Sequence, residues 1–248
     1  MKSNRMILKL TLWVLTTLCL PVTGFAQKHE GAAPLQIRAV LHDPVHPSAE
    51  LFLPDAAGAM VKLKLVPEGL SEAQNTQTVN GSFILYNTAE VDPKNPAASL
   101  GASVRVPADT KRAIIVVLPG PAGVAPAYRM VLINDSPAAF PKGESRVLSL
   151  VPVETAIEAG EHKLPVPSGK IVAVPPVKKV NEFNMAQTNF YYRQKNAKAW
   201  IPFTERQLQY LDDFRRIFIV HVTPGATEPA VTTVVDTSPP VIPAERRP

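Results

Sequence analysis

Residues 113–118 (AIIVVL), 128–134 (YRMVLIN) and 146–151 (RVLSLV) decide the fold of this chain. Turn-rich segments separate these aliphatic runs, at residues 119–127 (PGPAGVAPA) and 135–145 (DSPAAFPKGES). Short aliphatic runs bounded by Pro, Gly, Asp and Asn are typical of buried β-strands. Helices are disfavoured because the runs are short and because proline near their ends interrupts helical hydrogen bonding. We therefore expect a buried β core in this part of the chain.

Further strand candidates lie on both sides of this core. Apolar and polar residues alternate in residues 35–41 (LQIRAVL) and 61–66 (VKLKLV), which is typical of strands with one buried face. The remaining candidates are residues 51–53, 82–86, 99–106, 154–157, 162–166, 170–174, 183–193, 199–203, 215–222 and 230–235. About seven candidates precede residue 135, and that spacing favours an antiparallel β-sandwich.

We expect an all-β fold of two immunoglobulin-like or related β-sandwich lobes. The turn-rich segment after residue 134 is the best boundary, which places the first lobe at residues 34–138 and the second at residues 143–236. A single larger sandwich is the alternative that the sequence leaves open. Residues 237–248 are rich in proline and carry no apolar stripe, so we expect a disordered C-terminal tail. No internal repeat is evident in the sequence.

Residues 204–214 (TERQLQYLDDF) are the one helical candidate. Thr204 and Gln207 fit a capping box, and Leu208 and Leu211 could form an apolar stripe. The sequence does not decide between a short helix and another conformation here.

The N-terminus has the features of a secretory signal peptide. A basic start is followed by the apolar residues 10–20 (LTLWVLTTLCL), and Gly24 and Ala26 supply the small residues of a cleavage site. We expect residues 1–26 to be removed, which makes the protein exported, to the periplasm or the cell exterior, with no integral membrane segment in the mature chain. A membrane anchor and a lipoprotein lipidated at Cys19 are the alternatives.

The composition of the mature chain excludes several functions. Cys19 is the only cysteine, so its removal leaves no disulfide, no thiol nucleophile and no cysteine metal ligand. Three of the 26 Lys and Arg are lost with residues 1–26, which lowers the net charge from +5 to +2. Nucleic-acid binding therefore loses its main compositional support. No phosphate-binding or dinucleotide-binding motif is present, and we expect no cofactor.

The spacing of the histidines along the sequence does not predict a metal site. His42 and His46 lie four residues apart, a spacing that chelates zinc on a helix, but the prolines among them exclude a helix. We therefore expect loop histidines there and no metal. His162 and His221 lie on strand candidates, and whether they meet other polar groups cannot be deduced from the sequence.

No residue pattern predicts catalysis. The G-x-S-x-G motif of serine hydrolases is absent, and Ser145, the nearest match, precedes a strand instead of a helix. Asp212 and Asp213 are adjacent, so their carboxylates diverge and we expect them to be solvated. We therefore assign no catalytic residue and expect that the protein is not an enzyme.

The aromatic residues are concentrated late in the chain, and some of them suggest binding. Tyr191 and Tyr192 are consecutive, so on a strand they face opposite sides and one lies outside. Arg193, Lys195 and Lys198 add positive charge beside them, and an exposed aromatic with nearby cations can contact a sugar or a protein. These five residues are our candidate binding site for an envelope protein or a glycan. The alternative is that the aromatics of this region fill a core, as we expect for Trp200.

Two resemblances follow from particular motifs. Residues 189–195 (NFYYRQK) resemble the late Tyr-Tyr-Arg strand of periplasmic pilus chaperones, although that family's paired basic residues cannot be placed here. The motifs VRVPADTKRAIIVVLP (104–119), NDSPAAFPKGE (134–144), AWIPF (199–203) and RRIFIV (215–220) resemble a loose group of uncharacterised exported bacterial β-rich proteins. That resemblance implies no activity. The function that we expect is a non-catalytic exported binding or structural module of the cell envelope; a secreted hydrolase and a periplasmic chaperone-like protein are the alternatives.

Overall fold

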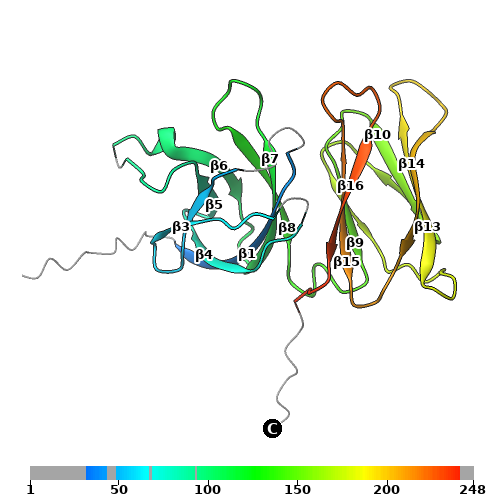
Figure 1. The fold of residues 1–248 in the computed structure, drawn as a ribbon, viewed down its shortest axis with the longest axis horizontal. Helices are drawn as coiled ribbons and strands as arrows, with labels where there is room; N and C mark the ends of the chain where they lie inside the picture. The colour runs from blue at the N-terminus through cyan, green and yellow to red at the C-terminus, as the bar shows by residue number, and fades with distance from the viewer. Residues whose placement is uncertain (1–31, 44–48, 67–68, 93, 241–248) are drawn as a thin grey trace, which may run out of the picture.

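The protein is all-β. The computed structural model describes residues 32–43, 49–66, 69–92 and 94–240, and in these residues sixteen strands form four four-stranded sheets (Figure 1). A single-turn 3₁₀ helix, η1 (Pro96–Ser99), is the helical element of the described chain. The fold class expected from the sequence is thus confirmed at the level of an all-β structure.

The first half of the chain forms two of the sheets, with strand orders β4-β1-β7-β8 and β3-β2-β5-β6. We refer to this half as the first lobe. Its strands are β1 (Ala33–Leu41), β2 (Phe52–Pro54), β3 (Met60–Lys62), β4 (Gln74–Thr78), β5 (Ser82–Tyr86), β6 (Leu100–Arg105), β7 (Arg112–Pro119) and β8 (Tyr128–Asn134). The two sheets enclose an apolar core that includes Ile37, Leu53, Phe83 and Ile115.

The second half forms the other two sheets, with strand orders β12-β9-β15-β16 and β11-β10-β13-β14. We refer to it as the second lobe. Its strands are β9 (Ser145–Ser149), β10 (Glu154–Ala159), β11 (His162–Val166), β12 (Ile171–Val174), β13 (Met185–Arg193), β14 (Ile201–Gln209), β15 (Arg215–His221) and β16 (Ala230–Asp236). A separate core between its sheets includes Val147, Ile157, Phe190 and Phe218.

The two lobes have the same topology. In each, the first and seventh strands pair in parallel, β1 with β7 and β9 with β15, and all other pairs are antiparallel. The strand order of each sheet in the second lobe repeats that of the first, shifted by eight strands. The repeat lies in strand order and strand direction, whereas the side chains have diverged, so the sequence does not display it.

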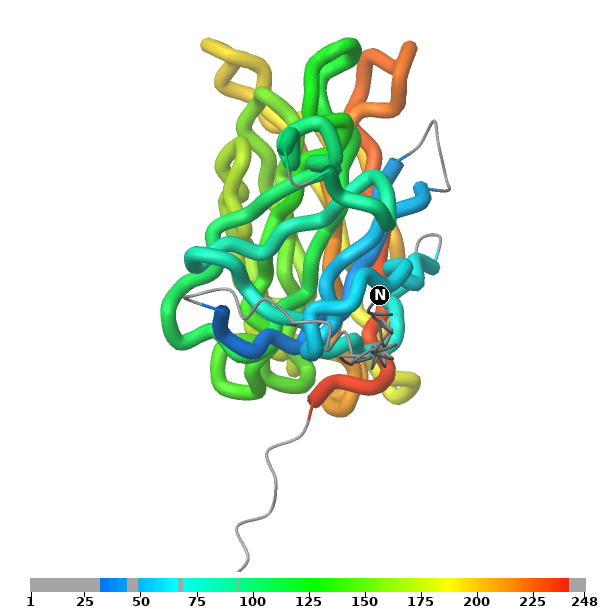
Figure 2. Tube along the Cα trace, turned by 90° about the vertical axis from the view of Figure 1, so that its left-hand side faces the viewer, coloured from blue at the N-terminus to red at the C-terminus, as the bar shows by residue number. Residues whose placement is uncertain are grey.

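The lobes pack face to face, so the molecule has four layers of sheet (Figures 1 and 2). The sheet that contains β7 lies against the sheet that contains β15, and their facing side chains form a third core, which we name the seam core. Its buried members are Val40, Ile114, Val116, Leu118, Ile133, Phe140, Leu148, Ile217, Ile219 and Val234.

The seam core explains why the central runs are aliphatic without alternation. Successive residues of a strand point to opposite faces, so Ile115 and Val117 fill the first lobe's core while Ile114 and Val116 fill the seam core. In β15 the alternate residues divide in the same way between the second lobe's core and the seam core. The burial expected for Ile115 and Ile219 is confirmed, since both are 0% exposed.

The structure decides one conformation that the sequence left open, and it contradicts one sequence-based expectation. The helical candidate at residues 204–214 contains most of strand β14, which pairs antiparallel with β13, and a turn follows it. Pairing with β13 outweighs the local capping signal, and inward-facing Leu208 packs against the lobe core. Trp200 is 38% exposed and not part of a core, because the chain enters β14 just after it.

Both ends of the chain extend past the described residues. Residues 1–26, the predicted signal peptide, lie outside them, as do residues 241–248 of the predicted tail. The first residues of that tail lie on the protein: Pro239 is buried, and the Ser238 carbonyl accepts a hydrogen bond from Arg38 Nη1 at 3.4 Å. Among the described residues no helix is long and apolar enough to cross a membrane.

Candidate functional site

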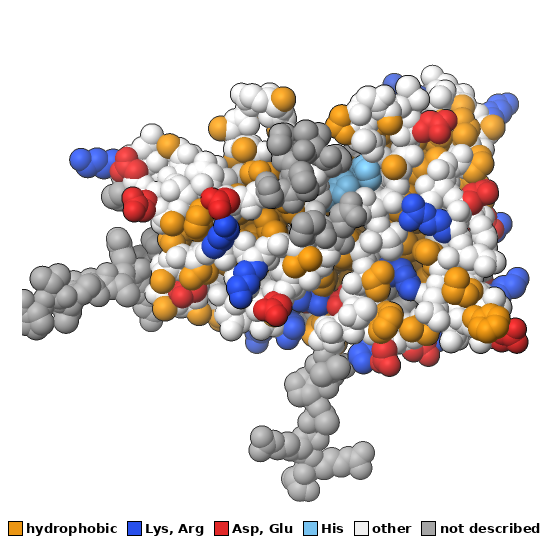
Figure 3. Space-filling view, in the orientation of Figure 1, with side chains coloured by type: hydrophobic (Ala, Val, Ile, Leu, Met, Phe, Trp, Pro, Cys, Tyr) orange, Lys and Arg blue, Asp and Glu red, His pale blue; other side chains and the backbone are white. Residues whose placement is uncertain are grey.

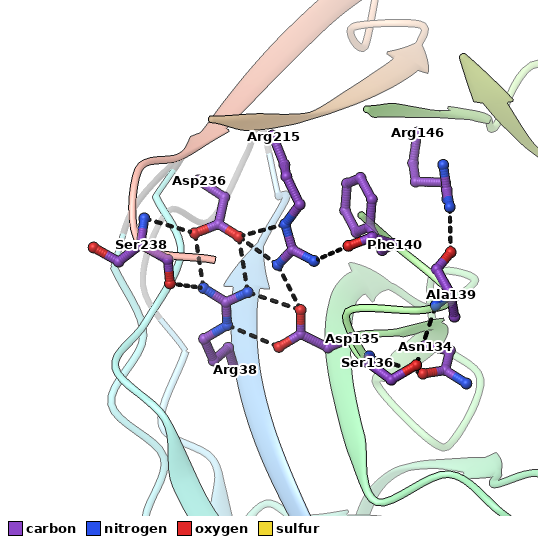
Figure 4. Close-up of polar contacts among 10 residues, drawn as sticks. All are labelled: Arg38, Asn134, Asp135, Ser136, Ala139, Phe140, Arg146, Arg215, Asp236 and Ser238. Carbon is purple, nitrogen blue, oxygen red and sulfur yellow. Dashed lines mark hydrogen bonds and ion pairs between the residues drawn. The ribbon is translucent and has the colours of Figure 1, made fainter. Parts of the chain in front are cut away.

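One end of the seam between the lobes is closed by four buried charges (Figure 4). Arg38 of β1 and Asp135, which follows β8, come from the first lobe; Arg215 and Asp236, at the start of β15 and the end of β16, come from the second. Arg38 donates to Asp135 and to Asp236 at 2.8 Å each. Arg215 donates from Nη2 to Asp135 at 2.6 Å and from Nε to Asp236 at 3.0 Å. We name these four residues the charge cluster.

The charge cluster is balanced and enclosed. Burial alone would raise the pKa of Asp236, but the hydrogen bonds and charges of Arg38 and Arg215 outweigh burial and hold that pKa below its ordinary value. Arg215 is 0% exposed, donates to the Phe140 carbonyl at 2.7 Å and stacks over the Phe140 ring at 4.1 Å. Two of the cluster's ion pairs, Arg38 with Asp236 and Arg215 with Asp135, connect the two lobes. Because the four side chains are buried, a ligand cannot reach them, and the charge cluster does not serve as a binding site.

At the other end of the seam, two histidines meet. His42 follows directly after β1 and His221 ends β15, and their ring centroids are 4.4 Å apart. Burial, followed by the nearby charge of His221, lowers the pKa of His42 to about 4, so its imidazole is neutral at pH 7. His221 Nε2 lies 3.1 Å from the Thr232 hydroxyl. This end of the seam is therefore polar but uncharged at His42.

A cavity of about 890 Å³ opens beside the histidine pair, and we name it the seam cavity. Figure 3 shows histidine side chains at the surface between the lobes. Both lobes contribute to its lining, through residues 42–43, 87, 97–98, 100, 118–125 and 127–129 of the first lobe and residues 150–152, 221–222 and 224 of the second. Ligand cavities in proteins commonly have volumes of about 300–1,000 Å³ and commonly lie between domains. The seam cavity matches both descriptions.

The lining of the seam cavity is mostly apolar and small. Alanine, proline, glycine, valine and leucine form most of it, and the β7–β8 loop at residues 120–127 supplies one wall. Val124 and Val222 stand at its rim, 57% and 41% exposed. Tyr128 adds a phenol whose pKa is raised by burial and by the nearby charge of Asp43. The cavity can therefore hold a ligand that is mostly apolar and can form a few hydrogen bonds with it at one end.

The five residues of the sequence-predicted binding site lie in the second lobe, away from the seam. Tyr192 is buried with its ring 6.0 Å from that of Phe203, whereas Tyr191 lies on the outer face of the sheet, as expected for consecutive strand residues. Arg193 and Lys195 line a smaller cavity of about 430 Å³, and Lys198 lies in the loop that precedes β14.

The outer-face members of that site have partners within the protein. Tyr191 donates its hydroxyl hydrogen to Glu158 at 3.1 Å. Arg193 donates from Nε to Glu154 at 2.8 Å, and its guanidinium lies 4.6 Å from the Trp200 ring centroid. The structure thus brings Tyr191 and Arg193 onto one exposed face together with Trp200, and places Tyr192 on the opposite face.

The other residues considered from the sequence are distributed over the molecule. Ser145 is buried at the start of β9, and Asp212 and Asp213 are exposed and pair with Lys178 and Lys142 at 2.9 and 2.8 Å. His162 contacts the Pro176 carbonyl, with Nε2 3.2 Å from the oxygen. Within the described part of the chain, no group of three or more His, Cys, Asp or Glu could hold a metal ion.

Sequence reasoning missed the pairing of His42 with His221. It compared His42 with His46, which lies outside the described residues, because the two are close in sequence. The signal that could have found the pair is positional: each histidine stands at the end of an aliphatic strand run, at residues 35–41 and 215–220. Had both runs been placed in facing sheets, the histidines would have been expected to meet.

Comparison with known proteins adds no homology-based assignment. No protein-family model and no curated protein matches the chain. The function must therefore be argued from the seam cavity and the exposed faces alone.

Proposed function

We propose that the protein is an exported, non-catalytic binding module of the cell envelope, built from two immunoglobulin-like lobes. In this proposal a partner protein inserts an apolar segment into the seam cavity. The observation that carries the proposal is the seam cavity itself, a largely apolar space of about 890 Å³ formed by both lobes. The seam core and the ion pairs that cross the seam, Arg38 with Asp236 and Arg215 with Asp135, hold the two walls in a fixed relation, which limits the entropy lost when a ligand binds.

A protein partner fits the rim better than a small molecule does. Val124 and Val222 extend the apolar surface of the seam cavity outward on both lobes. A small ligand confined to the cavity would leave both side chains in water, whereas a protein surface with one inserted side chain would cover them. Contiguous apolar surface of this kind is typical of interaction sites.

The lining favours binding over the rival reading as a secreted hydrolase. The described residues that line the cavity include no serine, threonine or cysteine to act as a nucleophile. His42 is buried and its pKa of about 4 makes it a weak base near neutral pH. The predicted signal peptide and the cysteine-free mature chain agree with an exported protein whose stability comes from its apolar cores.

Site-directed photocrosslinking in the exporting cell tests the proposal. A photoreactive residue is placed at Ala98, which lines the seam cavity, at Val124 on its rim, and at Ala108, an exposed control position outside it. We expect the same protein adduct from positions 98 and 124 and none from position 108. The purified partner should then bind the Ala98→Phe variant at least ten-fold more weakly than the wild type. Adducts with lipid alone, or equal binding by Ala98→Phe, would refute the protein partner.

A further inference from the structure

The outer face of the β11-β10-β13-β14 sheet is a continuous polar surface. Along β13 the side chains at positions 186, 188, 190 and 192 are buried, so those of Gln187, Asn189, Tyr191 and Arg193 point outward. Lys163 of β11 and Glu158 of β10 lie opposite each other beside them. No other sheet of the described residues covers this face, because the second lobe packs on the first through its β12-β9-β15-β16 sheet (Figure 1).

Hydrogen bonds connect these side chains into one row. Gln187 Nε2 donates to Asn189 Oδ1 at 2.7 Å, and Asn189 Nδ2 donates to the Tyr191 hydroxyl at 3.3 Å. That hydroxyl in turn donates to Glu158, which is paired with Lys163 at 2.9 Å. We name these five residues the polar row. The row crosses three strands, and the mutual bonds orient its amides before any ligand arrives.

Two cations on this face are already matched by carboxylates. Lys163 pairs with Glu158, and Arg193 donates to Glu154 at 2.8 Å. An anionic ligand would therefore have to displace a carboxylate from each cation, whereas a neutral ligand leaves both pairs intact. Amide side chains both donate and accept hydrogen bonds, as the hydroxyl groups of a sugar require.

An aromatic ring stands at the end of the polar row. Arg193 follows Tyr191 on the outer face of β13, and its guanidinium lies 4.6 Å from the Trp200 ring centroid, with Trp200 38% exposed. A large, partly exposed indole with one polar neighbour can pack against the C–H face of a sugar ring. The equivalent face of the first lobe is different, since Phe52, Ile84 and Tyr86 occupy it and are half-buried.

We propose that the polar row and Trp200 form a binding surface for a neutral glycan, separate from the seam cavity. The hydroxyl groups of successive sugars bond to the amides of Gln187 and Asn189 and to the Glu158 carboxylate, and one sugar ring packs on Trp200. The surface attaches the protein to envelope polysaccharide and leaves the seam cavity open.

Tryptophan fluorescence offers a direct test, because Trp200 is the only tryptophan after residue 26. The exported chain is titrated with soluble neutral polysaccharides (glucan, mannan, xylan and galactan) and with the anionic polysaccharide alginate. We expect a saturable change in emission with at least one neutral polysaccharide, and at least ten-fold weaker binding by the double variant Gln187→Ala/Asn189→Ala. The matched control is Ser82→Ala/Ser103→Ala, on the outer sheet of the first lobe.

Each variant is first shown to be folded by thermal unfolding. We expect all of them to fold, because the substituted side chains lie on the protein surface. Binding of alginate alone, no response to any neutral polysaccharide, or equal affinity in the Gln187→Ala/Asn189→Ala variant would overturn the glycan proposal. The Ala98→Phe variant of the seam cavity should bind the glycan as the wild type does. A failure of the cavity proposal and a failure of the glycan proposal are thereby distinguished.

Discussion

Replacing Asp236 with Asn should destabilise the protein strongly, because the carboxylate neutralises two buried guanidinium groups. Asp236 accepts hydrogen bonds from Arg38 at 2.8 Å through each of its oxygens, and Arg215 Nε donates to it at 3.0 Å. An asparagine keeps the shape but turns an NH₂ group toward donors. Two guanidiniums then share Asp135 alone, which leaves one uncompensated positive charge inside the seam.

The expected loss follows from that residual charge. Removing one partner of a buried ion pair costs about 3–5 kcal/mol. For a domain of this size the unfolding temperature falls by about 2–4 °C per kcal/mol, so we expect a decrease of about 6–20 °C in Asp236→Asn. The matched control is Asp213→Asn, since Asp213 pairs with Lys142 at 2.8 Å but is 80% exposed, and exposed pairs contribute about 0–1 kcal/mol.

Denaturant and thermal unfolding of three variants give the test. The double variant Arg38→Met/Asp236→Leu removes one charge of each sign and leaves Arg215 paired with Asp135, so it should be more stable than Asp236→Asn. Two results would refute the reasoning. In one, Asp236→Asn unfolds within about 1 °C of the Asp213→Asn control. In the other, the double variant is no more stable than the single one, so the residual charge is not the cause.

Four further predictions follow from the same structure. The pKa of His42 is about 4 in the folded protein and about 6.5 in the unfolded chain, so as the pH falls the unfolded chain takes up the proton at a higher pH than the folded protein does. The free energy of unfolding should therefore decrease as the pH drops from 7 to 4, by at most about 3 kcal/mol. The variant His42→Leu should flatten this part of the profile of stability against pH. Ile219→Asp should unfold the protein because it places an unpaired carboxylate in the seam core, whereas Val222→Asp at the exposed rim should change the unfolding temperature little. In Gly120→Ala the added Cβ would lie 2.6 Å from the Pro126 carbonyl oxygen, so we expect a loss of about 1–3 kcal/mol by thermal unfolding and none for Ala122→Ser. Intact-mass measurement of the exported protein should give a chain that begins at Gln27; a heavier, lipidated chain that retains Cys19 would contradict the predicted cleavage.

The strands were predictable where the seam core and the lobe cores bury both faces. In residues 113–118 of β7 and 217–220 of β15 every side chain lies in a lobe core or in the seam core, so the runs AIIVVL and IFIV carry the signal without interruption. Strand β14 was predicted only at its start, within the candidate at residues 199–203. The rest was missed because β14 is an edge strand whose exposed positions hold Glu205, Arg206 and Gln207, residues that also favour helices. The expectation that Trp200 lies in a core failed for a related reason. Aromatic side chains are buried on average, but Trp200 directly precedes the edge strand β14, which begins at Ile201.

The candidate sites divide in the same way. The sequence could indicate that one of Tyr191 and Tyr192 lies outside, because consecutive residues on a strand face opposite sides, which requires only local geometry. The structure shows that Tyr191 is the outer one. It could not indicate the seam cavity, whose lining residues are spread along the chain from His42 to Pro224. That cavity depends on which two sheets pack against each other. The aliphatic runs indicate that a sheet is buried on both faces, but they do not indicate which other sheet it packs against.

The two sheets that meet at the seam have the same topology, but the contacts of their charged side chains differ. Arg38 lies opposite Ile114 and Arg146 lies opposite Ile217, so the two arginines hold equivalent places in the two lobes. Arg38 binds both carboxylates of the charge cluster, whereas Arg146 pairs with Glu144 at 2.7 Å and stacks on Phe140. Equivalent strands thus supply the apolar seam core symmetrically, while charged side chains at equivalent positions have different partners. Because a buried charge must find its specific partner, the asymmetric cluster favours the pairing of the first lobe with the second over the pairing of either lobe with a copy of itself.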